Sequence, residues 1–399
     1  MLLPWAVIVV FSTISAWRYG WGLPRREISD HRPPVAVIVA VKGVSPETRA
    51  FFKKLLAQAY GDFRIIAAVE SREDPAFALI TQVAQDAPRD ITLTVAGNVM
   101  DGGQKVANLL AALEKLDPRD EIVIFTDADT LPHPLWVSRL VSALIDARHE
   151  AVTGYRWMIP TNTNLSSAVV AAANTSIVTL PRIPFATNLC WGGTMALRRE
   201  TLERLNIKKY WEGAISDDLQ MSRALKDHKI AIFSPRQSLL LSPVAFNWRS
   251  AFAFGIRQYR MIFTHVPLLW AFAIFCLITP ILSAGLACLL AAQGNSAAIL
   301  MLVFALIAGE LRFRSRRRIA RALWDEDQAG PRRLASSTDR WLRPLWWAFH
   351  AACALAAPVS RKISWAGIDY LVRGPQEVRV LPPEEPLSSD FRTDPRRSA

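Results

Sequence analysis

Two aspartates separated by one residue, Asp127 and Asp129, follow an apolar run at residues 122–125. Aspartates often end strands because their side chains hydrogen-bond the local backbone, so the pair can be part of a turn. Carboxylate oxygens are also the ligands that Mg²⁺ and Mn²⁺ prefer, and these ions often share them with substrate phosphates. The pair alone does not separate a turn from a metal site, because short motifs also occur by chance.

Other charged residues stand beside apolar runs and could complete a site with this pair: Lys42, Glu70, Lys105, Asp217, Asp218, Arg257 and Arg260. Each also has a simpler explanation. Lysines at loop starts are usually solvated, Asp217 can cap the helix that follows it, and the two arginines can flank a membrane span. Taken together, the set indicates a site for a phosphorylated, sugar-like ligand beside a membrane.

The first half of the chain predicts the elements that would hold such a site. Strands are expected at 35–41, 63–69, 91–95 and 121–125, and helices at 46–59, 74–85 and 104–116. This alternation is typical of the α/β class with a mostly parallel sheet. In open α/β sheets, catalytic groups gather beyond the carboxyl ends of the strands, where Asp127 and Asp129 would lie. A dinucleotide fold and a P-loop are disfavoured because neither glycine-rich motif is present.

Beyond residue 150 the pattern is weaker. A strand is expected at 152–157 and a helix at 164–178, and residues 190–205 predict a glycine-rich loop, a short strand and a helix. The tail at 375–399 is rich in Pro, Ser and charge, so we expect it to be disordered.

Three apolar blocks raise the hydrophobic content to 51%. Residues 1–17 carry no charged side chain and would span roughly 25 Å as a helix, near the lower limit for crossing a bilayer. A signal peptide is the alternative, but the block lacks a basic start and a clear cleavage site, which favours a retained anchor. Residues 261–309 contain no Asp, Glu, Lys or Arg and can form two spans of ~20 residues each. Residues 341–359 form a weaker, Trp-rich block that suits an interfacial or re-entrant helix at least as well as a span.

Arginines cluster after the first span and after the helix pair, so the positive-inside rule places residues 24–260 in the cytosol and the N-terminus outside. We therefore expect a multi-pass integral membrane protein, in the inner membrane of a bacterium. The net charge of +12 suits a protein lying against anionic lipid. Binding to a nucleic-acid polymer is disfavoured, because the arginines cluster beside the spans. The four cysteines form no C-x-x-C pair, which argues against a disulfide framework or a zinc site and fits a reducing compartment.

Eight segments in order resemble the family 2 glycosyltransferases, most closely the ceramide-glucosyltransferase-like branch, over roughly residues 33–374. The segments are VAVIVAVKG (35–43), VESREDPA (69–76), GQKVANL (103–109), FTDADTLP (125–132), CWGGTMALRRETL (190–202), SDDLQMSRAL (216–225), RQYRM (257–261) and WAGIDYLVRG (365–374). The resemblance implies a GT-A fold with a Rossmann-like, mostly parallel sheet, transmembrane helices on both sides of it, and inverting transfer from a nucleotide sugar.

The resemblance also implies roles for the donor site. Glu70 would contact the uridine, with Asp74 as the other candidate for that carboxylate. Lys42 would lie at the nucleotide pocket and Lys105 near the diphosphate. Asp127 and Asp129 match the D-x-D. Asp129 would be the direct ligand of a divalent metal, Mg²⁺ or Mn²⁺, and Asp127 would orient the ribose or support the metal through water.

The family's catalytic acidic pair falls on Asp217 and Asp218, with Asp218 as general base. Arg257 and Arg260 match the [QR]-x-x-R-W motif, although Met261 replaces its Trp. That replacement leaves the cationic part of the motif intact. The glycine pair that ends in Gly193 would approach the donor sugar, or form a plain turn.

The main functional hypothesis is an enzyme that moves one sugar, from a UDP-hexose, to the hydroxyl of a membrane lipid such as ceramide, diacylglycerol or a hopanoid. A processive polysaccharide synthase is the alternative, disfavoured because few spans follow the catalytic part. A non-catalytic membrane scaffold is the third hypothesis. The expected domains are an anchor at 1–23, a cytosolic glycosyltransferase domain at 24–260, a transmembrane pair at 261–313, a basic loop with the third block and last motif at 314–374, and the tail.

Overall fold

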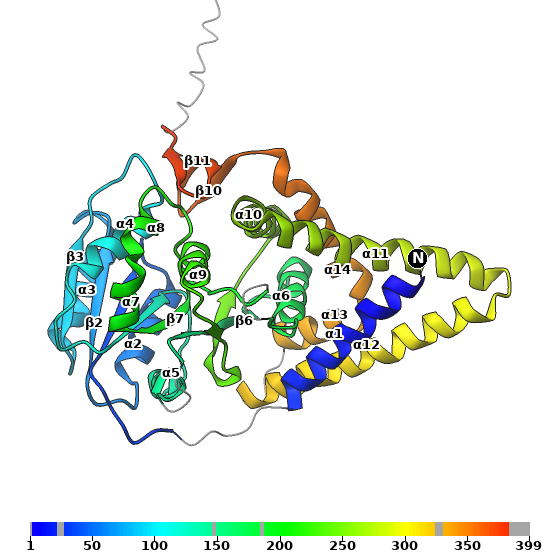
Figure 1. The fold of residues 1–399 in the computed structure, drawn as a ribbon, viewed down its shortest axis with the longest axis horizontal. Helices are drawn as coiled ribbons and strands as arrows, with labels where there is room; N and C mark the ends of the chain where they lie inside the picture. Colours follow the sequence, from blue (N-terminus) through cyan, green and yellow to red (C-terminus); the bar gives the residue numbers. More distant parts are fainter. Residues whose placement is uncertain (1, 22–27, 146–148, 184–186, 324–329, 383–399) are drawn as a thin grey trace, which may run out of the picture.

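The computed structural model describes residues 2–21, 28–145, 149–183, 187–323 and 330–382. An α/β part lies at one end of the molecule, and long helices extend from it to the other end (Figure 1). A layer of helices and one strand pair lies between the two ends.

A seven-stranded sheet forms the centre of the α/β part, in the order β3-β2-β1-β4-β7-β5-β8. Strands β1 to β4 pair in parallel, whereas β7 runs antiparallel to β4 and β5. The sheet is therefore mostly parallel, as the alternation of strands and helices predicts. The bounds are β1 (Val35–Ala40), β2 (Phe63–Val69), β3 (Ile91–Val95), β4 (Ile122–Asp127), β5 (Ala151–Thr153), β7 (Thr194–Arg198) and β8 (Ile232–Phe233).

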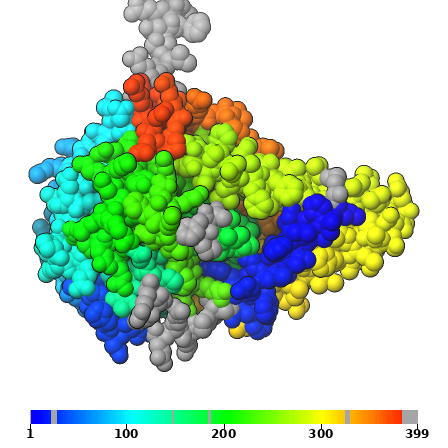
Figure 2. All heavy atoms as spheres, viewed as in Figure 1, coloured from blue at the N-terminus to red at the C-terminus, as the bar shows by residue number. Residues whose placement is uncertain are grey.

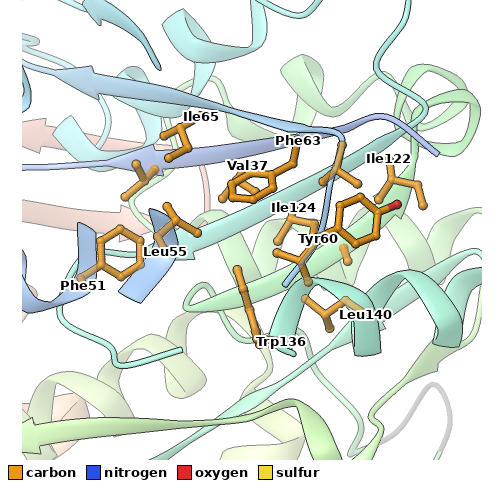
Figure 3. Close-up of a cluster of buried hydrophobic side chains, with 14 of the residues drawn as sticks. Val37, Phe51, Leu55, Tyr60, Phe63, Ile65, Ile122, Ile124, Trp136 and Leu140 are labelled. Atoms are coloured by element: carbon orange, nitrogen blue, oxygen red, sulfur yellow. The ribbon is translucent and has the colours of Figure 1, made fainter. Parts of the chain in front are cut away.

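Helices cover both faces of this sheet, which explains why β1 reads as an unbroken apolar run. On one face, Phe51 and Trp136 pack against Val37 (Figure 3). The neighbouring residue Ile38 points to the opposite face, where it joins Leu109 in a second core. The first face is covered by α2 (Pro46–Leu56), α3 (Pro75–Asp86) and α5 (Trp136–Ile145). The second is covered by α4 (Gln104–Leu113), α7 (Arg199–Leu205), α8 (Ile207–Trp211) and α9 (Asp217–Asp227).

Among the described residues, three helices are long and apolar enough to cross a membrane, by length and composition: α1 (Leu2–Trp21), α11 (Pro267–Ala292) and α12 (Ser296–Leu323). Figure 2 shows α1 in blue lying along α12 in yellow. The two helices run in the same direction, because Arg312 of α12 donates a 2.9 Å hydrogen bond to Thr13 and Ser315 lies against Gly20. Their carboxyl ends, with Arg18 in α1 and several arginines in α12, therefore lie together at the end of the helices that faces the α/β part (Figure 1).

The layer between the sheet and the membrane-length helices contains the parallel pair β6 (Tyr155–Pro160) and β9 (Leu239–Val244). Its helices are α6 (Leu165–Val178), α10 (Trp248–His265), α13 (Pro331–Trp341) and α14 (Arg343–Ala356), with short turns η1 (Arg236–Ser238) and η2 (Ala357–Val359). The 14 residues of α14 cover about 21 Å, less than a bilayer core, and pack against α6, α10 and α11. This length favours the interfacial or re-entrant alternative for the third apolar block.

Two expectations about local structure are wrong. The single strand expected at 152–157 is divided into β5 and β6 by Gly154, where an added Cβ would collide with the carbonyl of Ser238. The start expected for the disordered tail, at Pro375, is too early in the sequence. Residues Glu377–Val380 form β12, which completes an antiparallel sheet with β10 (Lys362–Trp365) and β11 (Ile368–Gly374). Val378 is buried there in a hydrophobic cluster. The average composition of residues 375–399 is polar, so it does not reveal this one buried side chain. Residues 383–399 lie outside the described part of the chain.

Candidate active site

A cavity of about 2340 Å³ opens beside the carboxyl ends of β1 and β4. Seven of the residues predicted for the site line it: Lys42, Lys105, Asp127, Asp129, Asp217, Asp218 and Arg257. Lys42, Asp127 and Asp129 stand at the carboxyl ends of parallel strands, and α4, α9 and α10 carry the other four to the same cavity. The convergence of residues 215 positions apart in the sequence on one cavity is the main structural support for a common site.

Lys105 connects two of the carboxylates. Its Nζ lies 2.7 Å from Oδ1 of Asp127 and 3.1 Å from Oδ1 of Asp217. Burial opposes the charge of this lysine, but the two carboxylates hold its pKa above the ordinary value. The Asp217 side chain is only 2% exposed, and its second oxygen has no hydrogen-bond partner among the described residues. Burial raises the pKa of Asp217 to about 6, while the charge of Lys105 opposes that shift.

We expect the rate of the sugar transfer that the motifs predict to fall as the pH is lowered through about 6, the pKa of Asp217. Because that pKa is raised on folding, the folded state binds a proton more tightly than the unfolded state, and the ionised Asp217 that pairs with Lys105 is lost on the acid side. The measurement is the rate against pH in detergent, for the wild type and Asp217→Asn. The variant should be slow at every pH and show no inflection near 6. The same inflection in Asp217→Asn would contradict the prediction.

Asp218 has a different environment. Ser216 caps α9 by accepting a hydrogen bond from the Leu219 amide, so neither aspartate is needed as the cap. Oδ1 of Asp218 accepts a 2.8 Å bond from that amide and a bond from the Ser216 hydroxyl, and Oδ2 accepts a 3.0 Å bond from the Gly192 amide. These three donors hold the carboxylate in one orientation, half-buried at the cavity wall. A carboxylate held in this way can accept a proton from a hydroxyl in the cavity.

The D-x-D carboxylates fit a divalent ion that shares its ligands with phosphate. Asp127 is engaged by Lys105, whereas Asp129 is exposed to the cavity and forms no ion pair among the described residues. The described residues contain no group of three His, Cys, Asp or Glu side chains that could hold a metal by themselves. One or two carboxylates together with substrate phosphates are nevertheless a common set of ligands for Mg²⁺.

Four predicted residues do not line the cavity. Glu70 forms an ion pair with Lys42, and it is Lys42 that lines the cavity. Asp74 caps α3 and accepts two bonds, of 2.9 and 3.1 Å, from the Gly43 amide. Arg260 donates to the carbonyls of residues 357 and 362 and so ties α10 to the C-terminal segment. These contacts give three of the four residues a structural role.

The fourth residue, Gly193, packs against the Trp191 ring, and it is Gly192 that faces the cavity. A Cβ at Gly192 would lie 2.7 Å from Nζ of Lys105 and 2.8 Å from Oδ2 of Asp217. Gly192 is therefore needed for close packing around the buried ion pair and Gly193 for packing against Trp191, and Gly192 is the one that lines the cavity.

Arg156 is a residue that the sequence analysis missed. Its guanidinium lies 4.0 Å from Oδ2 of Asp127 and 5.1 Å from the centre of the Trp191 ring. Arg257 adds a second cation from α10, and burial lowers its pKa to about 10, so it stays charged at neutral pH. Alternation along β6 could have indicated Arg156, but the bounds of that strand were not evident from the sequence.

The chain was compared with known proteins. A search of the curated proteins found no match to it. One similar solved structure is a mannosyltransferase from Pyrobaculum calidifontis in complex with GDP-mannose and Mn²⁺; it is 17% identical, with a TM-score of 0.46, and the match covers 90% of this chain and 98% of that one. The family model described as glycosyl transferase family 21 matches residues 2–378. This match over nearly the whole chain agrees with the resemblance carried by the motifs, and the protein belongs to glycosyl transferase family 21.

Proposed function

We propose that this glycosyltransferase moves a single sugar from a nucleotide sugar, such as a UDP-hexose, to the hydroxyl of a membrane lipid such as ceramide, diacylglycerol or a hopanoid. The observation that carries the proposal is the extent of the cavity. It continues from the carboxylates to an apolar region between α1, α6 and α11. That region is lined by Val7, Phe11, Ile177, Leu269 and Phe272. A lipid whose chains lie along membrane-length helices could bring its headgroup hydroxyl to Asp218.

The other end of the cavity suits the donor. The loop after β1, including Lys42 and Gly43, would face the nucleotide. Asp129, with support from Asp127, would hold Mg²⁺ or Mn²⁺, which when bound neutralises charge on the leaving diphosphate. Arg156 and Arg257 can donate charge-assisted hydrogen bonds to the same phosphate oxygens. Lys105 offsets the negative charge of the Asp127 and Asp217 carboxylates.

In this scheme Asp218 takes the proton of the acceptor hydroxyl while that oxygen attacks the anomeric carbon. Attack on the side opposite the diphosphate inverts the configuration. Trp191 lies in the cavity wall between Gly192 and Arg156, where an aromatic face can stack on the sugar ring. The membrane end of the cavity excludes water from the acceptor side, which favours transfer over hydrolysis.

The arrangement of the long helices supports a cytosolic active site. The carboxyl ends of α1 and α12 lie together and carry Arg18, Arg314, Arg317 and Arg318. The positive-inside rule assigns such an end to the cytosol, and the α/β part lies beside it. We therefore propose a multi-pass protein with its catalytic part at the cytosolic membrane face.

The test is mass spectrometry of lipids from cells with and without the protein. We expect one lipid class to gain the mass of a single hexose only when the protein is present. A ladder of many hexoses, or a soluble polymer, would favour a processive synthase instead. Unchanged lipids, together with no release of nucleoside diphosphate from UDP-hexoses in washed membranes, would contradict the proposal.

We expect chelation to stop the reaction. Because Asp129 is open to the cavity and no three-ligand metal site occurs in the described residues, the ion should bind weakly without substrate and be removed by EDTA. Transfer should fall at least tenfold, a modest expectation for the loss of a Lewis acid, and Mg²⁺ or Mn²⁺ should restore it. The assay is nucleoside diphosphate release in dialysed detergent extracts. Full activity after EDTA treatment would contradict metal dependence.

A further inference from the structure

A second group of cations lies in the same cavity, away from the carboxylates. Arg182 follows α6, and Arg236 begins η1 between β8 and β9. Both line the cavity next to Arg18 and Tyr19 at the carboxyl end of α1. Arg236 lies 5.3 Å from the centre of the Tyr19 ring, and both guanidiniums are close enough for their charges to act on the Tyr19 hydroxyl. Both arginines therefore lie around the Tyr19 side chain, although 54 residues separate them in the sequence.

These arginines have no acidic partner in the described part of the chain. Among the described residues, the acidic ones that line the cavity are Glu47, Asp127, Asp129, Asp217 and Asp218, which lie at the end of β4, in the loop after it and in the first turns of α2 and α9. Nε and Nη2 of Arg182 are buried without a hydrogen-bond partner among the described residues. Burial also lowers the pKa of Arg236. A half-buried cation with unpaired donors, as at Arg182, is costly, so the arrangement favours an anion beside the two arginines.

This anion site is distinct from the place proposed for the donor diphosphate. Arg182 lies 5.2 Å from the centre of the Tyr155 ring, and the centres of the Tyr155 and Trp191 rings are 5.9 Å apart. Arg156, which lies beside Asp127, is 5.1 Å from the centre of the Trp191 ring. The two aromatic rings thus stand in the chain of contacts between Arg182 and the D-x-D. The site is also close to the membrane, since Ser15 of α1 donates a 2.8 Å bond to the carbonyl of Thr179, three residues before Arg182.

We propose that Arg182 and Arg236 bind the phosphate of an anionic membrane lipid at the cytosolic end of α1. A guanidinium can donate two parallel hydrogen bonds to phosphate oxygens, and two guanidiniums line this end of the cavity. Ile14 of α1 and the exposed side chains of Leu180 and Ile183, beside Arg182, also line the cavity at this end and would contact the acyl chains. A phospholipid headgroup and free inorganic phosphate would both present phosphate oxygens to these arginines. The lipid is the favoured source because the site opens beside a membrane-length helix.

The experiment uses the full chain purified in dodecyl maltoside. Native mass spectrometry counts bound dioleoyl-phosphatidylglycerol, and the thermal midpoint is recorded as that lipid is added, because a ligand of the folded state raises the midpoint. We compare the wild type with Arg182→Gln, Arg182→Lys and Arg236→Gln. The matched control is Arg249→Gln, which alters an exposed arginine of α10 outside the cavity lining.

We expect the wild type and Arg249→Gln to retain one lipid. Either Gln variant should weaken binding by at least about tenfold, as the loss of a charged hydrogen bond does. Arg182→Lys keeps the positive charge, so its lipid affinity should lie between those of the wild type and Arg182→Gln. An intermediate affinity would show that the Gln variants lose lipid binding rather than their fold. Equal lipid binding by the wild type and both Gln variants would overturn the proposal. An equal rise of the midpoint with inorganic phosphate alone would overturn the lipid as the source. Because no sugar is transferred in this experiment, its failure would leave the proposed transfer reaction untouched.

Discussion

Replacing Asp218 by Asn is expected to lower the rate of sugar transfer by about 10²–10⁴-fold, the usual contribution of a general base. Asn keeps the shape of the side chain and one oxygen that can accept from the Leu219 or Gly192 amide. It cannot take the proton of an attacking hydroxyl. The loss should therefore fall on the turnover number, with the Michaelis constant for the donor little changed. Nucleoside diphosphate release at saturating donor and lipid is the measurement.

Asp227→Asn is the matched control. This aspartate lies at the other end of the same helix, α9, where it is exposed and accepts a 3.1 Å bond from Tyr210. The same chemical change there should leave turnover within about twofold, as for most surface substitutions. If Asp218→Asn kept normal turnover, or if Asp227→Asn lost as much activity, Asp218 would not be the base.

The first half of the fold was predictable because its strands are buried on both faces. Residues 63–69 and 91–95 form strands with the predicted bounds, since long apolar runs between polar turns have few other stable arrangements. The edge of the sheet then places Asp127 where the motif suggested. Beyond residue 150 the prediction was weaker. The pairing of β6 with β9 joins residues about 84 positions apart, and Gly154 interrupts the expected strand through contacts with distant atoms.

The residue types of the candidate site could be proposed from the sequence, but the contacts between its side chains could not. Sequence left open whether Asp217 caps α9, and the hydroxyl of Ser216 provides that cap instead. No local pattern shows that Lys105 reaches Asp217 across 112 positions. Arg260 stands inside a motif associated with substrate, yet its hydrogen bonds go to backbone carbonyls. For Lys105 and Arg260 the decisive contact is long-range, so spacing along the chain carries no information about it.

Replacing Lys105 by Met is expected to destabilise the protein by about 3–5 kcal/mol, the usual cost of removing one partner of a buried ion pair. Asp217 would be left ionised in a place where its side chain is 2% exposed and one oxygen already lacks a partner. Thermal unfolding in detergent at pH 7.5 should show a midpoint lower by several degrees. Lys115→Met, near the end of the same helical segment but exposed, should leave the midpoint unchanged.

The cause can be separated from simple loss of packing by a double-mutant cycle. If the cost comes from the unpaired charge of Asp217, adding Asp217→Asn to Lys105→Met should recover part of the lost stability, by about 0.5–3 kcal/mol. Lowering the pH should have a similar effect on Lys105→Met alone. Burial raises the pKa of Asp217, and without the lysine less positive charge opposes that rise. In Lys105→Met the pKa of Asp217 should therefore lie above its wild-type value of about 6. A penalty that is the same at pH 6 and pH 8, and that Asp217→Asn does not reduce, would mean that Lys105 stabilises the fold through its methylene chain.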